Sequence, residues 1–135
     1  MKNKIIALAI TGMAFSACSD NKKQEKDLLN QVIKLHDEVM AKDEQAVKNK
    51  MQLDSLIKTN RVTNKDSATV IVNNLSNADK AMEDWMHQFT VDNSGKPHDE
   101  VMRYLNNQKK KLTTVDSQVN QAVNQSNTYI STLKK

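Results

Sequence analysis

The amino-acid sequence predicts an all-α protein, an antiparallel three-helix bundle with coiled-coil-like packing. Apolar residues recur from Leu28 onward at spacings of three and four, which gathers them on one face of a helix. The chain contains two Gly and one Pro, and a β-rich or phosphate-binding fold needs more of these turn formers. Aromatic residues make up 4% of the chain, so the core must consist of Leu, Ile, Val, Met and Ala. That composition suits helices.

One bundle domain is expected over residues 28–135, with helices at about 23–58, 65–90 and 97–133. The breaks between these helices carry recognisable signals. Thr59 to Asn64 form a polar turn, and Asn64 or Asp66 can cap the second helix. The second break contains Gly95 and Pro97, and Pro97 suits the first turn of the third helix. Short connections of this kind place consecutive helices antiparallel to one another.

Each helix has an apolar stripe that predicts its core-facing side. The first stripe is expected to run through Leu29, Ile33, His36, Met40, Val47, Met51 and Ile57, with Leu28, Val32, Leu35 and Val39 beside it. The second comprises Ile71, Leu75, Ala78, Met82, Trp85 and Phe89. The third alternates by four and three throughout, and comprises Val101, Leu105, Gln108, Leu112, Val115, Val119, Ala122, Ser126, Tyr129 and Leu133.

Residues 1–17 are predicted to be a lipoprotein signal peptide. They combine a positive start, a short apolar stretch and two small residues before a cysteine, namely Lys2 and Lys4, residues 5–15, and Ser16-Ala17 before Cys18. The apolar stretch is too short to span a bilayer. The small residues and Cys18 resemble a lipobox, although Phe15 stands where Leu is usual. Cleavage before Cys18 and acylation of its thiol, for example with palmitate, would give lasting membrane attachment.

Residues 18–27 are polar and mixed in charge, and they are expected to form a short tether behind the lipidated Cys18. Only Asp20 supplies acidity soon after the cysteine, so the protein is expected to face the periplasm from the outer membrane of the bacterial cell envelope. Loss of Lys2 and Lys4 with the signal peptide lowers the formal net charge from +4 to +2. This small, interspersed excess does not indicate a nucleic-acid partner.

A pentapeptide occurs twice, as His36 to Met40 and as His98 to Met102. The functional interpretation is a paired site that uses histidine with adjacent carboxylates. The structural interpretation, which we favour, is that both copies satisfy one helical pattern, with polar residues outside and Val-Met inside.

Counting residues from the two turns places His36, His87 and His98 at nearly one level of the bundle. The helical rotation puts His87 on the outer face. Histidine with methionine suits copper, so a metal site remains an alternative, with His36, His98, Met40, Met82 and Met102 as its candidate ligands. Methionine is also an adaptable core residue, and we therefore expect neither a bound metal nor another cofactor.

Cys18, the stretch His36 to Met40 and the stretch Ala81 to Phe89 (AMEDWMHQF) together resemble a group of small Bacteroidota lipoproteins. These are often labelled viral A-type inclusion protein-like, a label that reflects coiled-coil similarity and implies no activity. No catalytic motif is visible in the sequence. The sequence therefore favours a non-enzymatic, lipid-anchored interaction or spacer module with an envelope protein as partner, and self-association is equally compatible. The alternative function is a periplasmic carrier of copper or a small ligand.

Overall fold

The computed structural model describes the backbone of residues 15–133 and the side chains from Asp20 to Leu133. This part of the chain forms three α-helices and no strand: α1 (Phe15–Lys58), α2 (Lys65–Gln88) and α3 (His98–Leu133). Residues 1–14 of the predicted signal peptide lie outside the described range, as does the side chain of Cys18.

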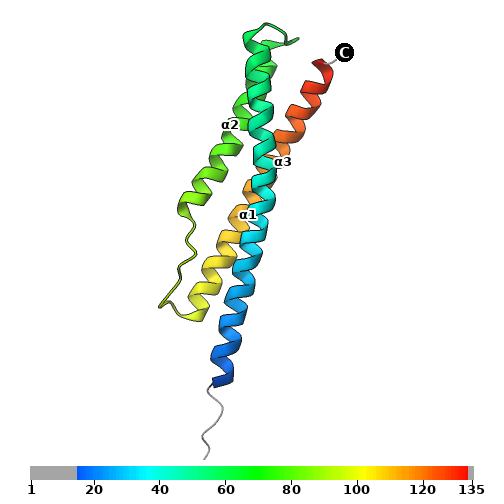
Figure 1. Cartoon of the computed structure of the whole chain (residues 1–135). Helices are drawn as coiled ribbons and strands as arrows, with labels where there is room; N and C mark the ends of the chain where they lie inside the picture. The colour runs from blue at the N-terminus through cyan, green and yellow to red at the C-terminus, as the bar shows by residue number, and fades with distance from the viewer. Residues whose placement is uncertain (1–14, 134–135) are drawn as a thin grey trace, which may run out of the picture.

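The three helices form a long, narrow bundle in which each helix contacts the other two (Figure 1). Consecutive helices are antiparallel, so α1 and α3 run in the same direction. The predicted fold class is confirmed. The helix boundaries also match the expected ones within two residues, apart from the beginning of α1.

Helix α1 begins at Phe15, well before the expected position near residue 23, and it continues through the segment that was expected to be a tether. Local side-chain pairs stabilise this part of the helix. Lys22 Nζ lies 2.9 Å from Glu25 Oε2, and Gln24 Nε2 donates to Asp20 Oδ2 at 3.1 Å. The prediction of a tether rested on the absence of an apolar stripe. Polar pairs three and four residues apart stabilise a helix without such a stripe, so the prediction was wrong here.

The turn between α1 and α2 is built from backbone hydrogen bonds and one side-chain cap. Asn60 has a φ of 57°, and the amides of Asn60 and Arg61 donate to the carbonyl oxygens of Ile57 and Leu56. This is a Schellman motif, in which Asn tolerates the left-handed conformation that ends a helix. Asn64 Oδ1 then accepts the amide of Ser67 at 2.9 Å, which confirms Asn64 as the N-cap of α2.

The core consists of a large cluster along most of the bundle and a smaller one of Leu28, Val101 and Leu105 near its base, and the predicted stripes of α2 and α3 are largely confirmed. In α3 every predicted position from Val101 to Ser126 is buried, and at the end of the helix Ile130 is buried more deeply than Tyr129. The α2 stripe is buried from Leu75 to Trp85, while Ile71 and Phe89 pack against the core from its edge.

The predicted stripe of α1 is wrong by one row. Its buried apolar residues are Leu28, Val32, Val39, Ala46 and Leu53. Ile33, Val47 and Met51 face outward, and the side chain of Met51 is 67% exposed. Two adjacent apolar rows on α1 have the same helical period, so periodicity alone cannot choose between them. The buried row from Val32 to Leu53 repeats every seven residues, which is the spacing of a coiled-coil seam.

None of the helices in residues 15–133 is both long enough and apolar enough to cross a membrane.

Candidate functional sites along the bundle

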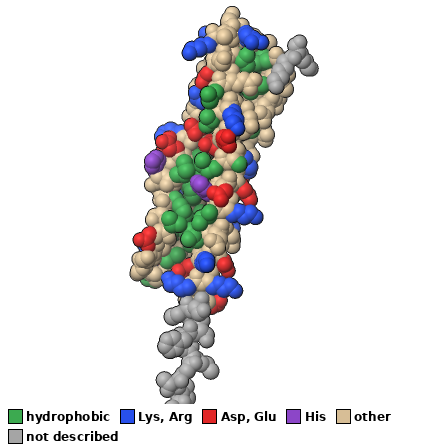
Figure 2. Space-filling model, in the orientation of Figure 1, with side chains coloured by type: hydrophobic (Ala, Val, Ile, Leu, Met, Phe, Trp, Pro, Cys, Tyr) green, Lys and Arg blue, Asp and Glu red, His purple; other side chains and the backbone are tan. Residues whose placement is uncertain are grey.

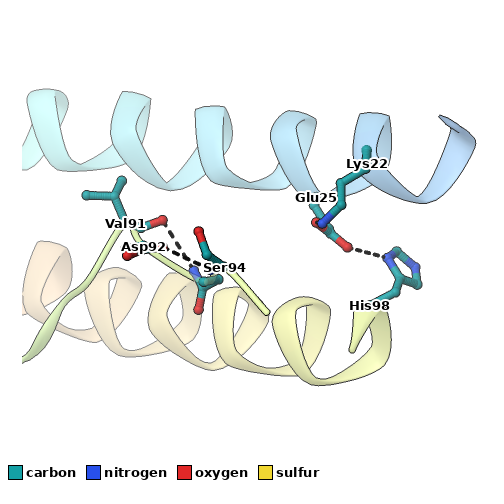
Figure 3. Close-up of polar contacts among 7 residues, drawn as sticks. Lys22, Glu25, Val91, Asp92, Ser94 and His98 are labelled. Carbon is teal, nitrogen blue, oxygen red and sulfur yellow. Dashed lines mark hydrogen bonds and ion pairs between the residues drawn. The ribbon is translucent and has the colours of Figure 1, made fainter. Parts of the chain in front are cut away.

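His98 joins α3 to the beginning of α1. Its Nδ1 lies 3.0 Å from Glu25 Oε1, and both residues are half-buried (Figure 3). Glu25 also contacts Lys22, and the hydrogen bonds from Lys22 and then from His98 hold the pKa of the Glu25 carboxyl below its usual value. The contact therefore fastens the segment next to Cys18 to the first turn of α3.

His36 has different surroundings. Its Nδ1 lies 3.0 Å from Oδ1 of the adjacent Asp37, and its ring packs at 5.8 Å from the ring of Trp85 in α2. Trp85 in turn stacks on Phe89 at 4.8 Å and donates through Nε1 to the carbonyl oxygen of Gln108. His36 is thus the edge of an aromatic cluster in the core.

The prediction that three histidines share one level is wrong. His98 lies beside Glu25, which precedes His36 by eleven residues on α1, or about 16 Å along the helix axis. The cause is the connection between α2 and α3. Residues 89–97 are not helical, and a non-helical segment advances about 3.3 Å per residue against 1.5 Å in a helix. Helix α3 therefore begins lower on α1 than the residue count implied.

The candidate methionines are divided in the same way. Met82 is fully buried in the larger core cluster and Met40 packs against that cluster, whereas Met102 packs against a separate cluster that contains Leu28 and Leu105. Within the described side chains, no group of three or more His, Cys, Asp and Glu is arranged to hold a metal ion. A site that joins His36 to His98 and Met102 is therefore not assembled. His87, as expected, lies on the outer face, where its Nε2 is 3.6 Å from Glu83 Oε1.

The repeated pentapeptide follows the helical pattern that we favoured. Val39 and Val101 are both buried, Met40 and Met102 are half-buried beside them, and the acidic residues of both copies are exposed. The two histidines contact unlike partners, Trp85 in one case and Glu25 in the other.

The sequence analysis missed a buried carboxyl group in the middle of the bundle. Asp43 of α1 is 6% exposed, and its Oδ1 has no hydrogen-bond partner among the described residues. Burial, reinforced by the neighbouring carboxyl of Asp79 on α2, raises the pKa of Asp43 to about 6. The neighbouring residue on α1, Lys42, contacts α3 instead, and its Nζ lies 2.6 Å from Asp116 Oδ1. Helical spacing could have predicted the burial of Asp43, because this residue lies on the same face of α1 as Val39 and Ala46.

A second group of buried polar side chains lies six residues, or about 1.7 turns, further along α1. The buried Asn49 donates through Nδ2 to Ser126 Oγ at 2.7 Å and to Asn127 Oδ1 at 2.8 Å. A buried polar pair of this kind favours one register of two parallel helices, because any other register leaves the polar groups without partners.

The hollows of the surface are open grooves. One, of about 810 Å³, lies between the beginning of α2 and the end of α3, and its lining includes Val70, Ile71 and Tyr129. A second hollow continues it along the same two helices past Ala78 and Gln121. We call the facing surfaces of residues 67–78 of α2 and 117–133 of α3 the neutral strip, since neither segment contains Asp, Glu, Lys, Arg or His.

The described structure defines the chain as an all-α three-helix bundle with an open groove at the end distant from Cys18. No family model matches the chain, and comparisons with curated proteins and with solved structures also found no match. The resemblance to small Bacteroidota lipoproteins and the lipidation of Cys18 therefore stay predictions.

Proposed function

We propose that this chain is a lipid-anchored lipoprotein of the bacterial envelope that works without catalysis, as a spacer that holds a contact surface away from the membrane. The observation that carries this proposal is the continuity of α1, which is already helical at Cys18 and runs without a break to Lys58. A lipid on Cys18 would therefore be attached directly to a stiff rod.

The dimensions of the bundle fit a spacer. Residues 18–58 of α1 rise about 60 Å at 1.5 Å per residue. The turn between α1 and α2 and the end of α3 both lie at the end opposite to Cys18 (Figure 1). The contact between Glu25 and His98 supports the near end, where a flexible tether would otherwise let the rod tilt. The distal groove would then stand about 60 Å from the bilayer.

The charge at the near end is balanced. Lys22, Lys23 and Lys26 have exposed side chains close to Cys18, and blue side chains gather at that end of the molecule (Figure 2). Asp20, Glu25 and Asp27 in the same segment offset these three charges. The lysines can each contact a headgroup phosphate, but the orientation of the rod rests on the anchor and on the continuity of α1.

The surface favours contact with a macromolecule over enclosure of a small ligand. Small-ligand sites enclose most of the ligand surface, whereas the groove between α2 and α3 is open along its length. The separation of His36 from His98 removes the particular ligand set on which the carrier alternative was based.

The anchor is tested by producing the full chain in a bacterium with radiolabelled palmitate and then separating the membranes. We expect the wild-type chain to carry the label and to stay with the membranes after washing in high salt. Cys18→Ala should lose both properties, and Ser19→Ala, a matched change at the next residue, should lose neither. Equal labelling and equal membrane retention of Cys18→Ala would contradict the proposal.

The spacer role is tested on the same membranes with a photo-reactive amino acid at single exposed positions. Placed at Lys23, it should react with phospholipid, and placed at Lys58, at the far end of α1, it should not. Lipid adducts of equal yield at both positions would show that the rod lies flat on the bilayer, and the spacer proposal would be abandoned.

A further inference from the structure

The neutral strip differs from the rest of the molecule in its charge. Charged residues make up 27% of the chain, yet the twelve residues from Ser67 to Ala78 and the seventeen from Ser117 to Leu133 include none. These two segments lie side by side at the distal end of the bundle, on the walls of the open groove. The exposed side of α1 at the same level is charged, and includes the exposed pair Lys48–Glu44.

Amide side chains line much of the groove, and they are suited to pairing with their own kind. Asn74 donates through Nδ2 to Gln125 Oε1 at 3.2 Å across the groove. Each amide has two N–H donors and a carbonyl acceptor, so one such bond leaves capacity for others. Apolar contact is available beside them, since Val70 is 58% exposed and Ile71 is half-buried.

We propose that the neutral strip is a self-association surface, through which two copies of this chain pack side by side and parallel. In a parallel pair related by a two-fold axis along the bundle, each residue near the axis meets its own counterpart. A charged residue there would face an identical charge, which is destabilising, whereas an amide faces a group that can both donate and accept. The absence of charge along the strip means that no residue near the axis would face an identical charge.

The charge pattern favours a second copy over a different protein. Interfaces between different proteins use opposite charges for steering and for selection of the partner. The lining of the groove contains one charged residue, Asp66, and that residue lies at its end. No complementary charge on a partner would be attracted along the rest of the strip.

The size of the strip predicts a weak pair. The strip contains twelve residues of α2 and seventeen of α3, which extend about 18 Å and about 25 Å, and each helix is about 10 Å wide. Each copy would thus contribute about 430 Å², and the total of about 860 Å² lies below the usual range of specific interfaces. Confinement to one membrane raises the effective concentration and offsets this deficit. The association rests on the strip alone, and only its strength in the cell rests on the proposed anchor.

The test is disulfide crosslinking of the full chain in intact cells treated with an oxidant. A cysteine introduced by Gln121→Cys, in the exposed wall of the groove, should give a dimer band. Met51→Cys, at an exposed position on α1 at the same end of the bundle, should not. The wild-type chain, in which Cys18 is the only cysteine, provides the background.

Charge substitutions at Val70 test the mechanism. Added to Gln121→Cys, Val70→Lys or Val70→Glu should each lower the yield of the dimer at least tenfold, and co-production of the two variants with different tags should restore it. Met51→Lys is the matched control, and it should leave the yield unchanged. Circular dichroism of each variant checks that the helices are intact. Crosslinking that is unaffected by charge at Val70 would overturn the proposal.

Crosslinks at the two ends of the strip test whether the two copies are parallel. Thr132→Cys should crosslink to its own counterpart, and so should Gln118→Cys. Crosslinks that form only between these two different variants would identify an antiparallel pair and overturn the proposal. A chain that stays in the membrane fraction without any Gln121→Cys dimer would also overturn it and leave the anchor intact. Conversely, a dimer from a chain that leaves the membrane would support self-association alone.

Discussion

Nδ1 of His98 lies 3.0 Å from Oε1 of Glu25, and this contact joins the first turn of α3 to the part of α1 nearest Cys18. Because of it, the base of the bundle is held by two helices, although composition alone indicated a loose tether there. The proposed spacer role depends on this contact, because a helix that moved freely at its membrane end could not hold the distal groove at a fixed distance.

Glu25→Ala should therefore loosen the base of the bundle. Removal of the carboxylate takes away the partner of both Lys22 and His98, so we expect amide hydrogen exchange in residues 20–27 to become several-fold faster. Exchange around Leu53, in the distal core, should not change. Asp27→Ala, which removes an exposed carboxylate in the same segment, is the control. Equal exchange rates in the two variants would show that the contact contributes nothing to rigidity.

Acidification should stabilise the region around Asp43. The pKa of this carboxyl is raised from 3.8 to about 6 by burial and by Asp79. The folded chain therefore binds its proton more tightly than the unfolded chain does. The stabilising contribution of protonated Asp43 is complete below about pH 4 and is lost as the pH rises through about 6.

Asp43→Asn should remove this dependence. At pH 7 the amide avoids the buried charge and can donate to Asp79, so the free energy of unfolding should rise by about 1–3 kcal/mol. The difference from wild type should shrink as the pH falls to 5, as measured by chemical denaturation at several pH values. Asp27→Asn, at an exposed position, should change neither quantity. An unchanged stability profile for Asp43→Asn would mean that water already solvates this carboxyl.

Asn49 and Ser126 should be coupled energetically. Their hydrogen bond is 2.7 Å long and buried between α1 and α3, so Asn49→Ala and Ser126→Ala should each lower the free energy of unfolding by about 1–2 kcal/mol. The double variant should lose about 1 kcal/mol less than the two losses combined. Asn49→Ala paired with Ser117→Ala, an exposed site, should instead be additive. Additivity in the first pair as well would argue against a register-setting bond.

Two substitutions of Trp85 should distinguish the stability that its packing contributes from the stability that its hydrogen bond contributes. Trp85→Ala removes the ring between His36 and Phe89, and we expect it to lower the free energy of unfolding by about 3–5 kcal/mol. Trp85→Phe keeps most of the stacking but loses the bond from Nε1 to the carbonyl oxygen of Gln108, at a cost of about 1–2 kcal/mol. Thermal unfolding followed by circular dichroism measures both. Equal losses in the two variants would assign the whole effect to the hydrogen bond.

Helix number, the helix boundaries other than the beginning of α1, and the seam of α3 were predictable from residue spacing and local capping signals. In α3, apolar residues alternate by four and three, and their outward neighbours are polar, so one face alone can be buried. Asn64 and Pro97 marked the beginnings of α2 and α3 because capping is a local effect within one turn of helix. The candidate metal ligands were less predictable, because their relative heights depend on the path of residues 89–97.

The sequence by itself thus determined the fold class, since local periodicity and a lack of turn formers leave a helical bundle as the way to bury the apolar stripes. Only the tertiary structure decided which of the two apolar rows of α1 is buried, and it turned Asp43 and Asn49 inward with the chosen row. It also brought the uncharged segments of α2 and α3 together as one surface. The physical reason is that period and composition are properties of one helix, whereas burial depends on where its neighbours lie.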